Sequence, residues 1–460
     1  MKTRFFAAPG LALALALGWA AGASAQTATP LPSPEPLRLS LADAIQRALQ
    51  EGTAARLATN QTDVAQIQAR LARSGLPFQP QVSAGTLTAN ESINLATFGF
   101  APAPGEPPVT DPFNVVDAHI NVAMNLLDVA ARRRYQAALA GVRVGEEEQR
   151  RTENEVAAAV ASLYVSLGRS TERIDQIRAN VDLFQKLLGL ATDQKKAGVG
   201  TRLDTTRAEV QLARQRQDLL VAENQRDVAR LALLRAVGAD LGTEVVLTDD
   251  WTRAGASDST LDQALGRARQ ARPELTVLQE QLRAADLAVQ AAKAEKLPTV
   301  AAQAQGTESG NRLRDVAWSR TVGVAVNVPI LTGGRTEARI AEAEIRRDEL
   351  RIRQRDIERQ VEQEVRQALL QVQNARSRVE LADQSVRLAA DELELASDRF
   401  KAGLTSSIEV DNAQTSLSAS RDSRIEALAA EAQARFDLAR ATGDIRNLIP
   451  NSESLRREGK

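Results

Sequence analysis

The sequence contains one helix–turn–helix signature twice, 205 residues apart. The segment 401–413 and its near-copy 196–208 each begin with Lys-Ala-Gly, continue with small or polar residues, and resume behind an acidic residue. Glycine readily takes the left-handed backbone conformation that ends a helix. A hydroxyl residue followed three positions later by an acid is typical of a capping box on the next helix. Two such turns at a fixed offset indicate a duplicated protein built from helical hairpins; the capping pairs are Thr201 with Asp204 and Ser406 with Glu409.

Each repeat also predicts one β-hairpin. A helical pattern ends at Leu76-Pro77 in the first repeat and at Leu297-Pro298 in the second, because the residue before a proline favours extended geometry. Beyond each proline the apolar period changes from 3.6 residues to 2, as in 116–126, where the even positions are apolar. The sequence therefore predicts four strands in two hairpins, which span about 80–126 and 298–329.

Very long helices are predicted after the hairpins, over 128–195 and 335–401. Both tracts carry apolar residues every seven positions, which predicts a left-handed coiled coil. The clearest set is in the second repeat and consists of Val365, Val372, Val379, Val386, Leu393 and Phe400. At ~1.5 Å per residue, each tract would extend on the order of 100 Å. Returning helices are expected at 201–237 and 406–442, and a single shorter helix is expected before each hairpin, beginning at Ser40 and Thr260.

The repeats divide the chain into predicted segments. Residues 1–25 have the basic start, apolar run and small-residue site of a secretory signal, so we expect the mature protein to be exported. Residues 26–38 are rich in proline and predict an extended arm. The remaining predicted segments are the first repeat at 39–238, an inter-repeat linker at 239–259, the second repeat at 260–443 and a polar tail at 444–460.

Composition narrows the possible functions. The chain has no cysteine, which excludes disulfides, thiolate metal sites and a lipid-bearing N-terminal cysteine. Loss of the leader with its two basic residues would leave 56 basic against 59 acidic residues, a net charge of −3 and no electrostatic case for binding nucleic acid. The single histidine, His119, cannot form a metal or nucleophile site alone. We therefore expect neither an enzyme nor a bound cofactor.

The hairpins determine how such a chain could enter a membrane. No segment after the leader has about 18 uninterrupted apolar residues, so membrane passage would require β-strands. The two hairpins of one chain cannot close a barrel, whereas three chains would supply twelve strands. In such a barrel the even-numbered apolar residues would face lipid. The odd-numbered Asp117, His119 and Asn121 would then face a water-filled lumen, with Trp318 and Phe113 at the membrane interfaces. The alternative is a soluble sandwich, although four short strands would give so long a chain a poor core.

The ordered set of features resembles the TolC-type outer-membrane efflux ducts, over nearly all of residues 37–443. Both repeats have the order helix, hairpin, long helix, Ala-Gly tip and returning helix. The matching motifs are Leu-Ala-Asp-Ala-Ile at 41–45, Leu-Pro before each hairpin, Val-Pro-Ile-Leu-Thr-Gly-Gly-Arg at 328–335, and the two tips with the following Ala208 and Ala413. Each motif is weak alone, and the duplicated series is the specific signal.

The resemblance implies a mixed fold, with a long α-helical coiled-coil barrel and four strands per chain that form a twelve-stranded β-barrel in a homotrimer. It implies a location in the outer membrane of a Gram-negative bacterium, with a large periplasmic part. The protein would be the passive exit duct of a tripartite efflux or type I secretion system. Its partners would be an inner-membrane pump and a periplasmic adaptor, and its periplasmic end would be closed by the coiled hairpins until they dock.

The resemblance also implies roles for individual residues at the two tips. The family's acidic constriction maps onto Glu409 and Asn412, with Asp204 as an acidic partner on the first tip. The tyrosine and arginine that lock the gate in the family fall at Phe400 and Thr405, so this chain lacks the tyrosine hydroxyl and the guanidinium of that lock. Two alternatives stay open: easier opening, or a gate held by other contacts. Our hypothesis is that Glu409 forms the narrowest charged ring. The adaptor-contact candidates are Gly198, Val199, Gly200, Thr201, Gly403, Leu404, Thr405 and Ser406.

A second function class stays open from the sequence alone. The same helical hairpins could belong to a soluble periplasmic coiled-coil scaffold or a pump adaptor, with the β-hairpins in a soluble domain. Isolation of the protein from outer membranes as a stable trimer would favour the duct, and a monomer in the soluble periplasm would favour the scaffold.

Overall fold

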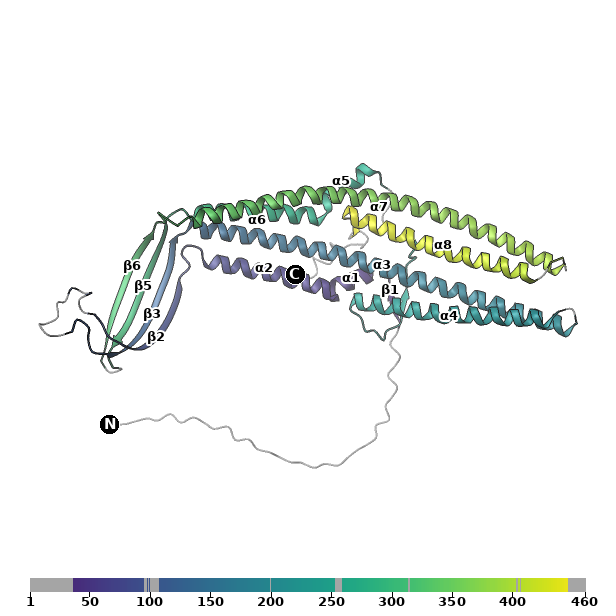
Figure 1. Cartoon of the computed structure of the whole chain (residues 1–460), viewed down its shortest axis with the longest axis horizontal. Coiled ribbons are helices and arrows are strands. Elements are labelled where there is room, and N and C mark those ends of the chain that lie inside the picture. The colour runs from purple at the N-terminus through teal and green to yellow at the C-terminus, as the bar shows by residue number, and fades with distance from the viewer. Residues whose placement is uncertain are drawn as a thin grey trace, which may run out of the picture.

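The structure is a computed structural model of the chain, and it describes residues 36–94, 97, 99, 107–198, 200–252, 259–312, 315–402, 404–405 and 407–445. The predicted signal sequence, most of the proline-rich arm, Val199, Gly403, Ser406 and most of the polar tail lie outside these residues. The described chain is elongated, with a sheet at one end and two helical hairpins at the other (Figure 1).

Eight helices occur in the described residues, and the four of each repeat follow the same order. Each repeat has two short helices before its hairpin, one very long helix after it and one returning helix. The helices are α1 (Leu41–Glu51), α2 (Thr53–Ser74), α3 (Val129–Lys196), α4 (Arg202–Val237), α5 (Leu261–Ala271), α6 (Pro273–Ala294), α7 (Arg335–Lys401) and α8 (Ser407–Thr442).

The single helix expected before each hairpin is wrong in both repeats, because the structure has two. In the first repeat the chain becomes extended at Gly52, with ψ at 135°, between α1 and α2. In the second repeat it becomes extended at Arg272, with ψ at 117°, and Pro273 begins α6. Proline is favoured at the first position of a helix and restricts the residue before it to extended geometry, which explains the second break.

Four antiparallel strands form one sheet in the order β2-β3-β5-β6, and they are the strands of the two predicted hairpins. Their bounds are β2 (Gln81–Glu91), β3 (Phe113–Leu127), β5 (Thr299–Gly310) and β6 (Val316–Asn327). The sequence did not predict a second, parallel pair, in which β1 (Leu37–Leu39) lies beside β4 (Val245–Leu247). This pair joins the end of the predicted proline-rich arm and the first residue of the first repeat to the segment between the repeats.

The register gives the large sheet two chemically different faces. Val82 lies opposite Val122, Val122 opposite Ala304, and Ala304 opposite Val322, so one face carries a row of apolar residues across all four strands. Val322 is 79% exposed. The adjacent row of the other face is polar and consists of Ser83, Asn121, Gln305 and Thr321. The predicted alternation of apolar and polar positions is therefore confirmed in the register.

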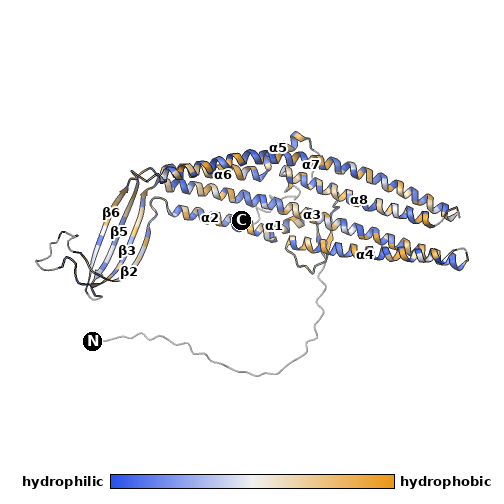
Figure 2. Cartoon of the chain, in the orientation of Figure 1, coloured by the Kyte–Doolittle hydropathy of each residue, from blue (hydrophilic) through white to orange (hydrophobic). Residues whose placement is uncertain are grey.

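The helices next to the sheet form a layer in the same order as the strands, with α3 contacting α2 and α6, and α6 contacting α7. Farther from the sheet, α4 packs on α3 and α8 packs on α7. Apolar and polar residues are interleaved along all of these helices (Figure 2). No helix in the described part of the chain is long and apolar enough to cross a membrane.

The largest apolar core lies midway along α3, where α1, α4, α8 and the β1–β4 pair meet it. Tyr164 and Phe436 are its largest fully buried side chains. The Tyr164 hydroxyl donates to the Leu39 carbonyl oxygen at 3.2 Å and accepts from the Asp249 amide at 3.2 Å. Burial raises the pKa of Tyr164, because it disfavours the charged phenolate. This core joins the two repeats in the middle of the molecule.

Candidate functional site

Both helix–turn–helix tips lie at the end of the molecule opposite the sheet (Figure 1). At the first tip, Gly198 has φ at 79°, the left-handed conformation that favours glycine. The Gly200 amide donates to the Gln194 carbonyl oxygen at 3.0 Å, which closes the end of α3. A Cβ atom on Gly200 would lie 3.0 Å from the Lys195 nitrogen, so a side chain there would need the backbone to shift. Helix termination therefore explains both glycines of this tip.

Thr201 and Asp204 form the predicted capping box at the start of α4. The Thr201 hydroxyl donates to Asp204 Oδ2 at 2.6 Å, and the Thr201 amide donates to the same oxygen at 3.0 Å. These hydrogen bonds lower the pKa of Asp204, because they stabilise the carboxylate. Asp204 is thus a charged group held by its own helix start.

Glu409 at the second tip has a cationic partner that sequence reasoning missed. Arg399 Nη1 lies 2.9 Å from Glu409 Oε1, and the Thr405 hydroxyl donates to Glu409 Oε2. Arg399 precedes the turn and Glu409 follows it, so the ion pair spans the tip from α7 to α8. The separation of ten residues does not match the three- or four-residue spacing of a pair within one helix. Only the fold of the turn makes these two side chains neighbours.

Phe400 is half-buried and packs with Leu393 against the buried Ala396, Val410 and Ala413. It therefore contributes to the apolar core of the α7–α8 hairpin.

The other predicted tip residues lie at the surface or just below it. Asn412 and Leu404 are exposed, and Thr405 is half-buried. Asp411, next to Asn412, is also half-buried, and burial raises its pKa while Arg207 on α4 opposes the rise. The structure thus brings Glu409 and Thr405 together, while Asp204 is engaged with Thr201 on the other tip.

The predicted lumen residues lie on one face of β3. His119 Nδ1 is 2.7 Å from Asp117 Oδ1, and Asn121 follows two residues later on the same face. Gly85 on β2 lies opposite His119, and a Cβ atom there would come within 2.9 Å of His119 Nε2. The glycine therefore gives the imidazole its space. These three residues are the polar counterpart of the exposed apolar face described above.

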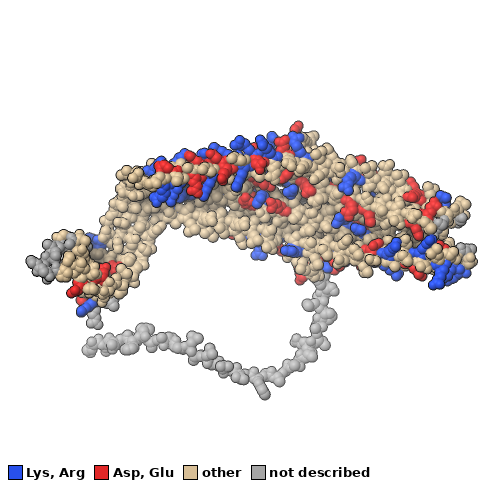
Figure 3. All heavy atoms as spheres, in the orientation of Figure 1, with Lys and Arg blue, Asp and Glu red and all other residues tan. Residues whose placement is uncertain are grey.

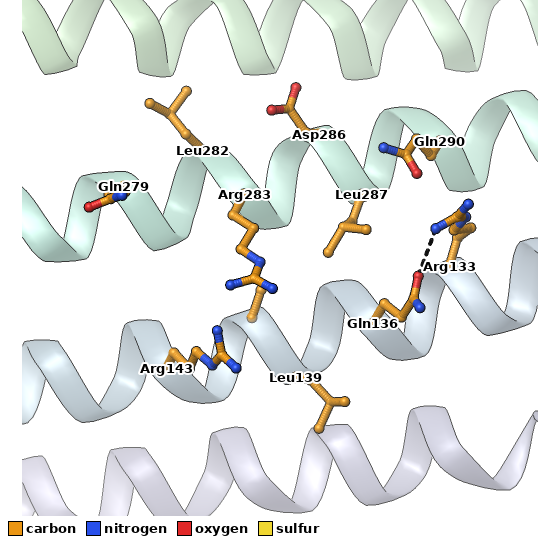
Figure 4. Close-up of a pocket in the computed structure, with 11 residues that line it drawn as sticks. Arg133, Gln136, Leu139, Arg143, Gln279, Leu282, Arg283, Asp286, Leu287 and Gln290 are labelled. Atoms are coloured by element: carbon orange, nitrogen blue, oxygen red, sulfur yellow. Dashed lines mark hydrogen bonds between the residues drawn. The ribbon is translucent and has the colours of Figure 1, made fainter.

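A groove of about 550 Å³ lies between α3 and α6 (Figure 4). Three arginines reach into it: Arg133, Arg143 and Arg283. Arg133 donates to Gln136 at 3.0 Å, while Arg143 and Arg283 each lie 3.9 Å from Glu280. Each guanidinium thus lies beside a polar partner, and no nucleophile with an adjacent base lines the groove. The described residues also contain no group of three or more potential metal ligands.

Charged side chains are distributed unevenly along the molecule. On the face in Figure 3, acidic and basic residues gather together along α6 and α7, whereas the middle of the sheet shows mostly uncharged residues. Many of the helix charges are paired, as in Lys293 with Glu344 at 2.7 Å and Lys296 with Glu337 at 3.0 Å. The sheet therefore differs from the helices in charge as well as in secondary structure.

Comparison with known proteins identifies relatives over most of the chain. The family profile "Outer membrane efflux protein" matches residues 44–239 and 264–444. A pyoverdine export outer membrane protein of Pseudomonas aeruginosa, OpmQ, is 25% identical over 297 residues, which cover 62% of this chain and 60% of OpmQ. Protein CyaE of Bordetella pertussis is 27% identical over 322 residues, which cover 68% of this chain and 65% of CyaE. The chain thus spans less than two thirds of the length of these relatives.

Solved structures share the fold over a larger part of the chain. The outer membrane protein VceC of Vibrio cholerae is 20% identical with a TM-score of 0.71, covering 88% of this chain and 96% of VceC. CusC, solved in a study of its transmembrane channel formation, is 19% identical with a TM-score of 0.73, covering 88% of this chain and 92% of CusC. At this level of identity the likeness establishes the fold alone, in which long helices are combined with a β-domain.

Proposed function

The chain belongs to the outer membrane efflux protein family, and from this membership we propose that it is the passive exit duct of a tripartite efflux or type I secretion system. The family consists of outer-membrane channel proteins of Gram-negative bacteria and not of enzymes, which confirms the resemblance seen in the sequence. We further propose that three copies assemble. Their sheets would form a twelve-stranded barrel, and their helices a tunnel that continues into the periplasm.

The observation that carries this proposal is a sheet with two unlike faces and two outer strands. β2 and β6 are the first and last strands of the four. Backbone groups at such edges need partners in hydrocarbon, and a closed ring supplies them. The apolar face, with exposed Ile120, Val322 and Val324, suits lipid. The polar face, with Asp117, His119 and Asn121, suits a water-filled lumen.

The outer helices of the layer support the same assembly. α2 and α7 are its first and last helices, and each carries exposed apolar residues seven positions apart. The pairs are Val64 with Leu71 on α2 and Ile345 with Ile352 on α7. Seven-residue spacing on an exposed face is typical of a seam with another helix. A neighbouring copy of this chain is the partner that would cover the exposed apolar pairs of α2 and α7 at the same time.

One hydrogen bond and two ion pairs across the layer indicate that these exposed apolar pairs lie at matching heights. Thr62 on α2 donates to the Gly145 carbonyl oxygen on α3, and Arg134 lies 3.5 Å from Glu295, the C-terminal cap of α6. Glu295 in turn accepts from Arg339 on α7 at 2.9 Å. Since neighbouring helices in the layer are antiparallel, Leu71 and Ile345 fall within about one turn of each other along the tunnel axis. Val64 and Ile352 then match one heptad farther from the sheet.

The duplication supports this arrangement independently. α3 and α7 are equivalent elements of the two repeats, as are α6 and α2. Within the chain, α3 packs beside α6. In a ring of three chains, α7 of one copy would pack beside α2 of the next copy in the same manner, which would make six similar units around the axis.

The tips would form the periplasmic mouth. The proposed gate consists of Glu409, Asn412, Asp204, Phe400 and Thr405. The coiled hairpins would close it in an iris-like manner, and docking of an inner-membrane pump with its periplasmic adaptor would open it. The adaptor would contact the glycines and hydroxyl residues of both tips, which are Gly198, Val199, Gly200, Thr201, Gly403, Leu404, Thr405 and Ser406.

Cysteine cross-linking tests the assembly cleanly, because the natural chain has no cysteine. We expect the double variant Leu71→Cys with Ile345→Cys to form a reductant-sensitive covalent trimer in outer membranes. The matched control combines Leu71→Cys with Leu388→Cys, which is also exposed on α7 but lies 43 residues beyond Ile345 along the helix. The control should not cross-link between copies. A soluble periplasmic monomer without cross-links would overturn the duct proposal and favour a scaffold or adaptor.

A further inference from the structure

The helix ends beside the sheet carry an excess of positive charge. Four seven-residue segments contain the ends of α2, α3, α6 and α7 that lie next to the sheet, and they are 68–74, 128–134, 290–296 and 335–341. These segments contain nine basic residues and three acidic ones, whereas the whole chain has 58 basic and 59 acidic residues. We call the four segments together the basic collar. Its charge makes it a candidate surface for an anionic partner.

Two adjacent arginines of the collar have no acidic partner. Among the residues that the structure describes, Arg132 forms no ion pair, and Arg133 donates to the neutral Gln136 at 3.0 Å. Arg134 differs from both, because it lies 3.5 Å from Glu295. The positive charges of Arg132 and Arg133 are therefore available to an anion from outside the chain.

Arg132 and Arg133 lie on the outer side of the proposed tunnel. Arg133 lines the groove between α3 and α6 (Figure 4). Arg132 shares a helix face with Leu139 and Arg143 of this groove, which follow it by seven and eleven residues. Gln279 on α6 lines the same groove, and it also lines a second groove together with residues of α5. An extra helix inside the ring would obstruct the tunnel, so α5 and both grooves belong on the outside.

The collar begins where the apolar face of the sheet ends. A tilted strand crosses the hydrocarbon of a membrane in about 9–11 residues. On β6 and just beyond it, a segment of that length runs from the exposed Trp318 to the exposed Val328. On the neighbouring repeat β3 ends at Leu127, and Arg132 follows within ~8 Å of helix. The long side chain of an arginine at that depth can extend into the headgroup layer.

An anionic glycerophospholipid matches this position in charge and in height. A guanidinium group donates charge-assisted hydrogen bonds to the oxygens of a phosphate, often two at once. Clusters of basic residues beside a membrane attract anionic lipids in the same way. The Gln136 amide, which already accepts from Arg133, can in addition donate to a lipid oxygen.

We propose that the outer face of the basic collar, at Arg132 and Arg133, binds the phosphate of an anionic glycerophospholipid in the periplasmic leaflet of the outer membrane. Three copies of the chain would give three equal sites around the barrel. The bound lipids would fix the height of the barrel in the membrane, because the two arginines stand directly below its apolar face. This inference rests on the proposed function, since it requires the sheet to lie in the membrane.

Native mass spectrometry of the detergent-purified trimer tests the lipid site. The probes are phosphatidylglycerol and phosphatidylcholine with identical acyl chains, so that they differ only in the headgroup. We expect the parent to prefer phosphatidylglycerol. Arg132→Gln with Arg133→Gln should weaken phosphatidylglycerol binding about tenfold, which corresponds to about 1.4 kcal/mol, and leave phosphatidylcholine binding unchanged. Arg132→Lys with Arg133→Lys keeps both charges and should retain most of the preference.

The matched control is Arg143→Gln with Arg283→Gln, which removes two arginines from the same groove but farther from the sheet. It should keep the preference for phosphatidylglycerol. Equal binding of the two lipids by the parent, or an equal loss in the control, would overturn the proposed site. Inorganic phosphate at the concentration of the lipid should not displace it. Displacement would show a site for free phosphate and would overturn the lipid assignment.

A further measurement needs no variant. Sodium chloride should weaken phosphatidylglycerol binding to the parent, because salt screens charges at an exposed surface. A preference that does not change with salt would contradict an electrostatic site at the collar. A soluble periplasmic monomer would refute the proposed function itself, whereas a stable outer-membrane trimer without a lipid preference would refute only this inference.

Discussion

Removal of Arg399 is expected to change ion selectivity in the opposite direction from removal of Glu409. The two side chains form an ion pair at 2.9 Å across the second tip, which we propose lines the narrowest part of the duct. Arg399→Gln would leave one uncompensated carboxylate per copy and three in the trimer. Glu409→Gln would leave three uncompensated guanidinium groups. In the parent trimer each of these charges has its partner. Its cation-to-anion permeability ratio should therefore lie between the ratios of the two variants.

The size of the effect follows from the number of charges. At about 5 Å from the axis, one carboxylate attracts a monovalent cation by ~0.8 kcal/mol in water, so three give ~2.5 kcal/mol. The ion pair is 57% and 40% exposed at its two side chains, so salt screens this attraction substantially. We therefore expect a change of roughly tenfold in the cation-to-anion permeability ratio, which about 1.4 kcal/mol would produce.

Reversal potentials of single channels under a potassium chloride gradient measure this ratio directly. Arg399→Gln should move the reversal potential toward cation selectivity and strengthen block by divalent cations. Glu409→Gln should move it toward anion selectivity and weaken that block. The matched control is Asp383→Asn, which breaks a 2.6 Å pair with Arg424 in the same hairpin but away from the tip. Reversal potentials that are equal in the parent and both tip variants would refute a charged constriction at Glu409.

Three further predictions concern stability. Phe436→Ala should lower the free energy of unfolding by ~3–5 kcal/mol, because it empties a fully buried site between the repeats; thermal denaturation measures this. Gly168→Ala should also lower the melting temperature, since its Cβ atom would lie 2.4 Å from the Trp251 ring. The stabilisation of the first tip by Asp204 should be present above its ordinary pKa of 3.8 and lost as the pH falls below that value through the lowered pKa of the folded state. Hydrogen exchange of the α4 start should show this loss, and Thr201→Val, which removes the hydroxyl donor, should weaken the pH dependence.

The duplicated architecture was predictable because its signals are local and repeated. Proline after a helical pattern, a change of period from 3.6 to 2 and a seven-residue apolar repeat each depend on neighbouring residues alone. The heptad positions Val365 and Val372 are indeed buried, and the intervening Ala368 and Ala375 are buried with them. The capping box of Thr201 with Asp204 also formed as its three-residue spacing predicted.

The features that sequence reasoning missed depend on distant contacts. The pairing of β1 with β4 joins residues more than 200 positions apart. Arg399 meets Glu409 only because the second tip turns between them. Asn180 on α3 and Gln414 on α8 are ordinary surface-type residues, and they become buried only when two hairpins of different repeats pack together. No periodicity within one helix distinguishes these residues from solvated ones.

Comparison of the two tips indicates which acid can take part in a switch. The repeats align at an offset of 205 residues, so Asp204 corresponds to Glu409, and Gln194 stands where the second repeat has Arg399. Asp204 therefore lacks the arginine found at the corresponding position of the second tip, and its carboxylate is held by the Thr201 amide and hydroxyl of its own helix start. Glu409 instead pairs with a side chain from the opposite helix of its hairpin. Movement of α7 relative to α8 would change the Glu409 pair and leave the Asp204 cap intact. A trimer would have six hairpins. Its three Asp204 carboxylates would cap their own helices, and its three Glu409 carboxylates would carry a charge that the conformation of the second tip can expose or neutralise.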